Sequence, residues 1–188
     1  MRIIAGEYRG RALASVGKGD VAAHLRPTSD RVRESLFNVL ASGGYDDPIS
    51  GVRVLDLFAG TGALGLEALS RGAAHVTFID DGAKALSLLR QNVGICRAQD
   101  DTRILRSDTR RLGVNKDAAF DLIFLDPPYG KRLGEQAISA AIKGGWIAED
   151  ALIVWEESAE IAVPEQLELL DQRKYGDTRI SILQAISV

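Results

Sequence analysis

The sequence is poor in the residues that form disulfides and metal centres. It contains one cysteine, Cys96, and two histidines, His24 and His75, in 188 residues. A single cysteine cannot form an internal disulfide, and no cluster of Cys, His and carboxylates has the spacing of zinc or iron ligands. We therefore expect no disulfide and no metal site, with Cys96 as a half-buried apolar residue and His75 in a structural role.

Long apolar runs are also missing. No stretch approaches the ~18 residues that a membrane span needs, and the start, MRIIAGEYRGR, carries charge where a secretory signal has its apolar core. These absences argue against a membrane role and favour a cytoplasmic protein. With 46% hydrophobic and 26% charged residues, the composition is that of a globular protein of one α/β domain, and a monomer is expected.

Charge is distributed unevenly along the chain. The net charge is −3, yet residues 1–40 hold seven basic and four acidic residues, so the remainder is distinctly acidic. Cationic side chains supply the sequence-independent part of nucleic-acid binding, so the basic segment is a candidate to lie along phosphates. A solvated helix face explains the same pattern equally well.

The first 50 residues are expected to form a small extension. Residues 3–5 and 10–13 are typical of two short strands in a hairpin, and RPTSDRVRESLFNVL places apolar residues at helical spacing behind Ser29 or Asp30 as a possible N-cap. We divide the chain into this N-terminal hairpin and helix, residues 1–50, and a main domain, residues 51–188.

Beyond residue 51, strand-like runs alternate with helical patterns. The runs are VRVLDLF, HVTFID, TRILRS, FDLIFLD and ALIVWEE, with helices expected around 63–71, 83–93 and 134–143. Such alternation predicts an α/β fold with a mainly parallel sheet and helices on both faces. Two further runs flank Tyr175-Gly176-Asp177 with no helix between them, which predicts an antiparallel hairpin at the sheet edge.

A glycine-rich turn follows the first of these strands. Gly60, Gly62 and Gly65 fit the pattern G-x-G-x-x-G, and Asp80 ends the next strand 20 residues after Gly60. Glycines allow a nucleotide-like ligand to approach the backbone, and an acidic side chain at this distance can accept hydrogen bonds from a ribose diol. This pattern alone suits a nicotinamide dinucleotide and S-adenosylmethionine equally well.

The position of Asp56 partly favours S-adenosylmethionine over a nicotinamide dinucleotide. A carboxylate at the end of the first strand sits badly beside a pyrophosphate but well beside the cationic methionine end of S-adenosylmethionine. Asp56 could instead cap a turn.

A second element, Asp126-Pro127-Pro128-Tyr129, follows the apolar run FDLIFL. It therefore occupies the carboxyl edge of the sheet, where open α/β sheets bind ligands. An amino group conjugated with a base ring is a poor nucleophile and needs hydrogen-bond acceptors, which the Asp126 carboxylate and the Pro127 carbonyl supply. Neither proline can donate an N–H, and Tyr129 offers a ring on which a base can stack. A rigid strand-ending turn is the alternative interpretation.

These segments resemble class I S-adenosylmethionine-dependent methyltransferases that act on exocyclic amino groups, through DLFAGTG and DPPY. Three more segments, MRIIAGEYRGRAL, LRPTSDRVRESLFNVL and GALGLEALSRGA, are similar to the RsmD family of bacterial ribosomal RNA methyltransferases. The resemblance implies a Rossmann-like sheet of seven strands with a reversed final hairpin. It also implies S-adenosylmethionine as donor and the amino group of a guanine in 16S ribosomal RNA, within a small-subunit particle, as acceptor.

The resemblance assigns roles to individual residues. It places Asp56, Gly60 and Gly62 near the methionine portion of the cofactor, with Phe58 and Ala59 also among the cofactor-binding residues. Asp80 would bind the ribose, Asp108 the adenine amino group, and Asp126 would face both cofactor and acceptor. The catalytic element maps onto Asp126, Pro127, Pro128 and Tyr129. The residues expected to contact RNA are Arg9, Arg11, Arg26, Thr28 and Tyr129.

Three alternatives remain at this stage. A nicotinamide-dependent dehydrogenase would use the same glycines and Asp80 but leaves the Asp-Pro-Pro-Tyr element unexplained. A non-catalytic RNA-binding protein would have no use for the complete set of ligand and acceptor groups. An adenine-N6 methyltransferase on RNA or DNA fits the Asp-Pro-Pro-Tyr element as well as a guanine-directed enzyme does, and the modified nucleotide and the assembly state of the substrate stay open.

Overall fold

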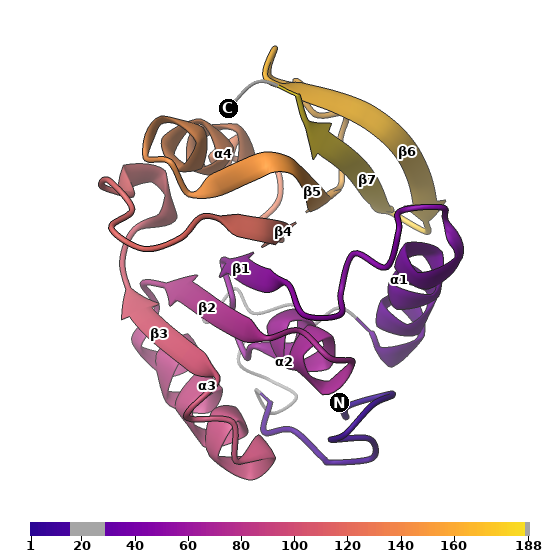
Figure 1. Cartoon of the computed structure of the whole chain (residues 1–188), viewed down its shortest axis with the longest axis vertical. Coiled ribbons are helices and arrows are strands. Elements are labelled where there is room, and N and C mark those ends of the chain that lie inside the picture. The colour runs from indigo at the N-terminus through magenta and orange to yellow at the C-terminus, as the bar shows by residue number, and fades with distance from the viewer. Residues whose placement is uncertain (16–28, 187–188) are drawn as a thin grey trace.

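A computed structural model describes residues 1–15 and 29–186 of the chain. Its centre is one sheet of seven strands in the order β3-β2-β1-β4-β5-β7-β6 (Figure 1). The strands from β3 to β5 are parallel to one another, whereas β7 is antiparallel to both β5 and β6. The predicted Rossmann-like α/β fold, with its mainly parallel sheet and reversed C-terminal hairpin, is therefore confirmed.

The predicted strands are present, with small changes at their ends. The strands are β1 (Arg53–Leu57), β2 (His75–Asp80), β3 (Thr102–Arg106), β4 (Phe120–Leu125), β5 (Ile147–Glu157), β6 (Leu167–Tyr175) and β7 (Thr178–Ala185). β5 begins four residues before its predicted start at residue 151, because Ile147 pairs with Phe120 ahead of an irregularity in the β4–β5 register.

The described residues also form four helices and one short 3₁₀ turn, of which α1 precedes the first strand and the others connect strands. They are α1 (Asp30–Ser42), α2 (Ala63–Ser70), α3 (Ala83–Cys96), η2 (Thr109–Arg111) and α4 (Leu133–Lys143). The predicted N-cap of α1 is confirmed, because the Ser29 side chain accepts a hydrogen bond from the backbone N–H of Val32. The helix predicted over 83–93 extends to Cys96, which is buried as an apolar residue.

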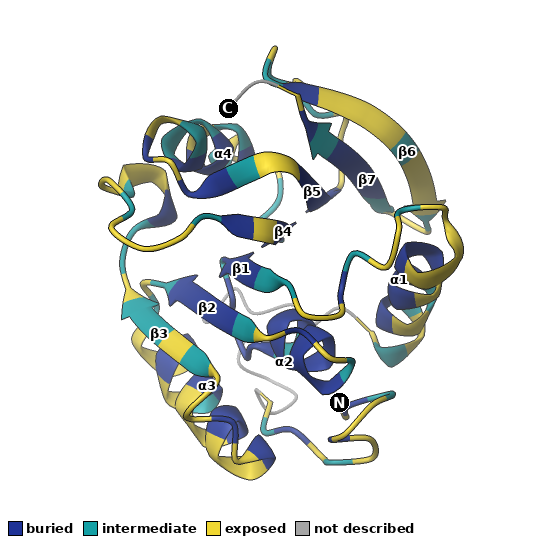
Figure 2. Cartoon of the chain, in the orientation of Figure 1, coloured by how far each residue is buried: buried dark blue, intermediate teal, exposed yellow. Residues whose placement is uncertain are grey.

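The helices cover both faces of the sheet. Side chains of α1, α2 and α3 form one apolar cluster with Val54, Phe78 and Phe124, while α4 packs on the opposite face against Leu55 and Ile123. Successive strand residues point to opposite faces, which is why neighbours such as Val54 and Leu55 belong to different clusters. Figure 2 shows the central strands buried between these layers and β6 largely exposed at the sheet edge.

The N-terminal segment forms the predicted small hairpin, but through one antiparallel bridge between Arg2 and Ala12 in place of regular strands at residues 3–5 and 10–13. The Ile3 N–H donates to the Arg11 carbonyl at 3.0 Å, and the Leu13 N–H donates to the Met1 carbonyl at 3.1 Å. The backbone N–H groups of Ile4 and Ala5 donate instead to the carboxylate of Glu67, at 2.8 and 3.0 Å. Glu67 is fully buried in α2, so it satisfies the N–H groups of the two residues that follow the paired part of the hairpin and anchors the hairpin to the main domain.

The predicted C-terminal hairpin is confirmed, with its turn at Gly176 in a left-handed conformation (φ 61°). Since β7 runs against β5, its first residue, Thr178, lies at the same edge as the last residues of the parallel strands. The hairpin turn thus contributes to the carboxyl edge.

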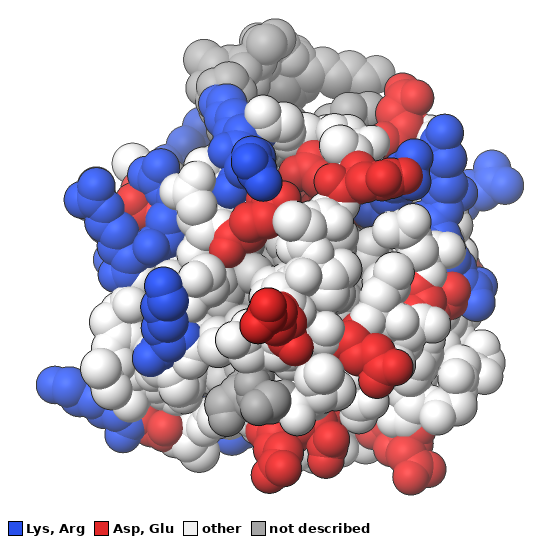
Figure 3. Space-filling view, turned by 90° about the horizontal axis from the view of Figure 1, so that it is seen from above, with Lys and Arg blue, Asp and Glu red and all other residues white. Residues whose placement is uncertain are grey.

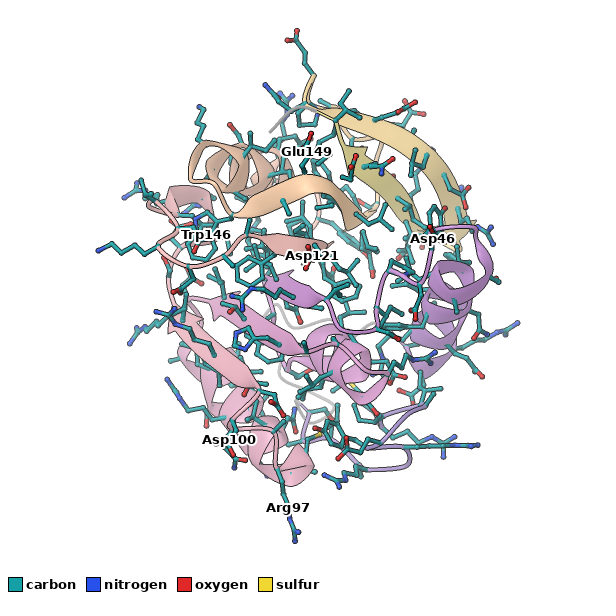
Figure 4. The ribbon with its side chains drawn as sticks, in the orientation of Figure 1. Asp46, Arg97, Asp100, Asp121, Trp146 and Glu149 are labelled. Carbon is teal, nitrogen blue, oxygen red and sulfur yellow. The ribbon has the colours of Figure 1, made fainter. Side chains whose placement is uncertain are left out.

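At the opposite edge of the sheet, where the parallel strands begin, side chains form hydrogen bonds that hold the fold together. The carboxylate of Asp121 accepts a hydrogen bond from the backbone N–H of Arg53 at 2.9 Å, and Trp146 Nε1 donates to the Gly113 carbonyl at 2.7 Å. Asp121 and Trp146 are labelled in Figure 4.

Within the described residues, no helix is long and apolar enough to cross a bilayer.

Candidate active site

Four acidic residues lie at or near the carboxyl ends of four adjacent strands. Asp56 lies in β1, Asp80 ends β2, Asp108 follows β3 and Asp126 follows β4. These strands are neighbours in the order β3-β2-β1-β4, so the four residues stand in a row along one edge. An edge of this kind, where the strand order reverses at β1 and β4, is the ligand-binding position of open α/β sheets.

The glycine loop after β1 has the backbone geometry that only small residues adopt easily. Gly60 and Gly62 have φ values of 56° and 78°, and Phe58 is held at 59°. Gly62 is the N-cap of α2, and its N–H donates to the Ala59 carbonyl at 2.7 Å. The loop therefore turns tightly and directs the first N–H groups of α2 towards the carboxyl edge.

Gly65, the third glycine of the pattern, has a packing role. A Cβ at this position would collide with the side chains of Phe78 and Val76 in β2. Glycine lets α2 approach the sheet closely, as the pattern predicts.

Asp80 joins the glycine loop to the start of α3. Its two carboxylate oxygens accept hydrogen bonds from the backbone N–H of Gly60 at 2.9 Å and of Gly82 at 2.8 Å. Burial raises the pKa of Asp80 above its usual range, while the two N–H donors act in the opposite direction. Each oxygen retains a second lone pair, so the carboxylate can also accept from a ligand hydroxyl.

Asp56 is buried directly beneath the loop, with 2% of its surface exposed. Its carboxyl group accepts a hydrogen bond from the Gly65 N–H at 3.0 Å. Burial, with the nearby charge of Asp80 adding to it, raises the pKa of Asp56 to about 8. Because burial and the charge of Asp80 disfavour ionisation of Asp56, this site gains from a cationic ligand.

Asp108 lies further along the same edge and is already engaged. Its carboxylate forms a two-point ion pair with Arg110, at 2.8 Å from Nε and 2.7 Å from Nη2. This hydrogen bonding lowers the pKa of Asp108 to about 2, so the group is ionised at neutral pH.

Tyr129 connects the Asp-Pro-Pro-Tyr element to β5 and β7 by hydrogen bonds. The Tyr129 hydroxyl donates to Glu156 Oε1 at 2.6 Å and lies 3.0 Å from Thr178 Oγ1. Burial and the hydrogen bond to Glu156 raise the pKa of Tyr129, so the hydroxyl stays protonated. Pro127 is buried, whereas Asp126, Pro128 and the Tyr129 side chain are partly exposed at the edge.

Sequence reasoning missed Glu156 and Thr178, which fix the position of Tyr129. Glu156 sits at the end of the apolar run ALIVWEE, and it is 8% exposed. A carboxylate placed there would have been the available signal, because a charged residue ending a buried strand lies at the carboxyl edge.

The basic residues expected to contact RNA have different surroundings. Arg9 is exposed, in a hollow of about 250 Å³ that also contains Asp30 and Glu34. Arg11 stacks on Tyr8, and its guanidinium donates to the carbonyls of Ile95 and Cys96 at 3.1 and 2.6 Å, which caps the C-terminus of α3. The other two residues, Arg26 and Thr28, lie outside the described residues.

The donor set at the carboxyl edge fits S-adenosylmethionine. Buried acidic groups suit its cationic methionine end, the Asp80 carboxylate suits a ribose diol, and the glycines leave room for close approach to the backbone. Within the described part of the chain, no three His, Cys, Asp or Glu side chains are grouped closely enough to hold a metal ion.

Comparisons with known proteins cover nearly the whole chain. Residues 1–184 match the model of a family described as Conserved hypothetical protein 95. Ribosomal RNA small subunit methyltransferase D of Escherichia coli K12 is 39% identical over 164 residues, which is 87% of this chain and 78% of the relative. The methyltransferase of the same name from Haemophilus influenzae is 38% identical, over 94% and 89% of the two chains.

A solved structure is similar over the same extent. That of the yhhF protein from Escherichia coli has a TM-score of 0.84 and 37% identity, and the match covers 100% of this chain and 99% of the other. At this identity and coverage, the similarity establishes the family of the chain as well as its fold.

Proposed function

Because the chain belongs to the RsmD family of ribosomal RNA methyltransferases, we propose that it transfers a methyl group from S-adenosylmethionine to the exocyclic amino group of a guanine in 16S ribosomal RNA. The observation that carries the proposal is the pairing of β1 with β4, in which Leu57 faces Leu125. This register starts the glycine loop and the Asp-Pro-Pro-Tyr element side by side.

The cofactor half of the site consists of the glycine loop and the carboxylates of the first three strands. Phe58, Ala59, Gly60 and Gly62 surround the methionine portion, above the buried Asp56. Asp80 accepts from the ribose hydroxyls, and Asp108 accepts from the adenine amino group. When bound, the cofactor supplies a methyl group activated by the positive charge on sulfur.

The acceptor half raises the reactivity of the amine by hydrogen bonding. The nitrogen lone pair of a guanine amino group is delocalised into the ring, so acceptors at the N–H groups favour the pyramidal geometry that exposes it. Asp126 Oδ and the Pro127 carbonyl are those acceptors. The Asp126 carboxylate would take up the proton that the amino group loses on methylation and pass it to water.

Tyr129 supplies the surface on which the target base stacks. Its hydroxyl is committed to Glu156 and Thr178, so the ring keeps one orientation, and this lowers the entropy lost when a base stacks against it. Pro128 completes a rigid connection between the acceptors and the ring.

We also propose that residues 1–50 form the RNA-contacting extension and residues 51–188 the methyltransferase domain. Arg9 offers an exposed guanidinium for phosphates, and Arg26 and Thr28 are carried over from the family motif. Arg11 stabilises the end of α3 through Nη1, and its remaining N–H donors contact the RNA backbone. The protein acts as a monomer on a small-subunit particle.

The experiment supplies S-adenosylmethionine with a labelled methyl group and 16S ribosomal RNA from a strain that lacks the modification, as naked RNA and as small-subunit particles. Mass spectrometry of the digested RNA identifies the product. N2-methylguanosine is the expected product. N6-methyladenosine would establish the adenine-directed alternative, and the absence of labelled RNA from both substrates would refute the proposal.

A further inference from the structure

A hollow of about 700 Å³ lies between η2 and α4 and is lined mainly by basic and polar side chains. Three of them are basic, Arg110, Arg132 and Lys143, and one is acidic, Glu135. Gln136 and Ser139 add uncharged hydrogen-bonding groups. In a chain with a net charge of −3, a concave surface with this excess of cations is a marked local feature.

The polar side of α4 that faces this hollow is continuous. Arg132, Gln136, Ser139 and Lys143 follow one another at intervals of four, three and four residues, which places them on one face of a helix. The opposite face of α4 is buried against the sheet through Ala137, Ile138 and Ala141. At 1.5 Å per residue, the polar stripe is on the order of 16 Å long, which exceeds the reach of a single small anion.

Two of the three cations are available to a partner. Arg132 and Lys143 are exposed, and neither forms an ion pair with another described residue. Arg110 is paired with Asp108, but its side chain is 41% exposed, and a guanidinium has five N–H donors, of which the pair uses two.

The hollow adjoins both halves of the proposed active site. Arg132 is three residues beyond Tyr129 and is the N-cap of α4, and Arg110 binds the carboxylate assigned to the adenine end of the cofactor. In Figure 1, α4 lies at the upper left of the molecule. Figure 3, turned about the horizontal axis from that view, shows Lys and Arg side chains at the left and right margins and acidic side chains between them.

We infer that the hollow between η2 and α4 is a phosphate-binding groove for the RNA strand that carries the target base. The inference rests on the proposed function and extends it, because the groove lies beside the acceptor element and apart from the basic N-terminal segment. Phosphate contacts set the register of a bound strand, while contacts at the base provide recognition. A base presented to Tyr129 has a flanking phosphate close to Arg132 at the start of α4, and the polar stripe continues the path of the strand towards Lys143 at the other end of the helix.

The test measures RNA affinity against salt for Arg132→Gln, Lys143→Gln and the double variant. Arg97→Gln is the matched control, since Arg97 is also an exposed arginine with left-handed backbone (φ 54°, against 52° for Arg132). Figure 4 shows Arg97 at the opposite end of the molecule, beyond α3. Calorimetry with S-adenosylmethionine and thermal melting show whether each variant remains folded.

Each groove variant is expected to reduce the slope of log K against log salt by about one, and the double variant by about two. Arg97→Gln should keep the wild-type slope. If wild-type protein methylates the RNA while the double variant binds it like Arg97→Gln, the groove is refuted and the proposed function stands. If wild-type protein neither binds nor methylates small-subunit RNA, the proposed function fails, and the groove with it. Binding of polyglutamate in place of RNA, dependent on Arg132 and Lys143, would overturn the inference in favour of an acidic protein partner.

Discussion

Tyr129 and Glu156 come from different strand ends, yet the hydroxyl of one donates to the carboxylate of the other at 2.6 Å. Thr178, from the reversed hairpin, lies 3.0 Å from the same hydroxyl. The aromatic ring of the Asp-Pro-Pro-Tyr element is thereby held by β5 and β7, strands that contain none of the residues proposed to bind the cofactor. In the proposed site, three segments of the chain together set the position of the stacking surface.

Removing the Tyr129 hydroxyl should slow methyl transfer and leave cofactor binding unchanged. Tyr129→Phe keeps the ring but loses a hydrogen bond to a charged group, typically about 1.5–3 kcal/mol, so kcat should fall roughly tenfold or more. Glu156→Leu should have the same effect, while Glu156→Gln retains an acceptor and should restore most of the rate. Wild-type kcat in both Tyr129→Phe and Glu156→Leu would show that the contact does not position the ring.

Asp126→Ala should strongly reduce turnover while the affinity for S-adenosylmethionine stays nearly intact. Loss of a transition-state acceptor of this kind costs about 10²–10³ in kcat. Asp126→Asn keeps one acceptor oxygen in place and should retain part of the rate. Calorimetry and single-turnover methyl transfer separate the two quantities, and an equal loss of binding and turnover in Asp126→Ala would contradict the role assigned here.

Asp80→Ala should weaken cofactor binding. The variant removes the acceptor for the ribose hydroxyls and leaves the Gly60 and Gly82 N–H groups without a partner, at a cost of about 1–3 kcal/mol. The neighbouring Asp81 is exposed, so Asp81→Ala is the matched control and should bind normally. Unchanged affinity for S-adenosylmethionine in Asp80→Ala would disprove the ribose assignment.

Asp56 should make the ligand-free protein less stable as pH rises. Its pKa is about 8 in the folded chain, against 3.8 as the ordinary value, so between these limits the folded state holds a proton that the unfolded state has released. The free energy of unfolding therefore decreases with pH over this interval, by at most about 1.4 kcal/mol per unit, and levels off above pH 8.

Denaturant titrations between pH 5 and pH 8.5 can measure this decrease. Asp56→Asn keeps an acceptor for the Gly65 N–H but does not titrate, so it should lose the part of the slope that Asp56 contributes. A variant with the same slope as the wild type would assign the pH dependence to other groups.

Gly134→Ala should destabilise the fold, whereas Gly94→Ala should not. A Cβ at Gly134 would lie 2.5–2.7 Å from the buried indole of Trp155, and overpacking of this kind costs about 1–3 kcal/mol. Gly94 is also helical, but a Cβ there meets nothing within 4 Å, so alanine should stabilise α3 by about 0.5–1 kcal/mol. Thermal melting of the two variants in parallel decides the comparison.

The parts of the fold that depend on local pattern were predictable from the sequence. Alternation of apolar runs with helical spacing indicated the parallel sheet, and Tyr175-Gly176-Asp177 between two runs indicated the reversed hairpin. The strand ends then placed Asp56, Asp80, Asp108 and Asp126 at one edge, because parallel strands present their carboxyl ends together.

Contacts between distant residues were not predictable in the same way. Glu67 binds the N–H groups of Ile4 and Ala5 from more than 60 positions away, so α2 holds the N-terminal hairpin in addition to the hairpin's own short pairing. The guanidinium of Arg11 likewise donates to a carbonyl at the end of α3, which lies about 85 positions further along the chain. Neither long-range partner can be identified from periodicity or composition.

The reversed direction of β7 links the acceptor element to the core. β7 supplies Ile180 and Ile182 to one apolar cluster and Leu183 and Ala185 to the other, and its first residue, Thr178, lies 3.0 Å from the Tyr129 hydroxyl. The strand that fills both faces of the sheet therefore also sets the orientation of Tyr129, so a substitution that loosens β7 should disturb that ring even when it lies far from the carboxyl edge.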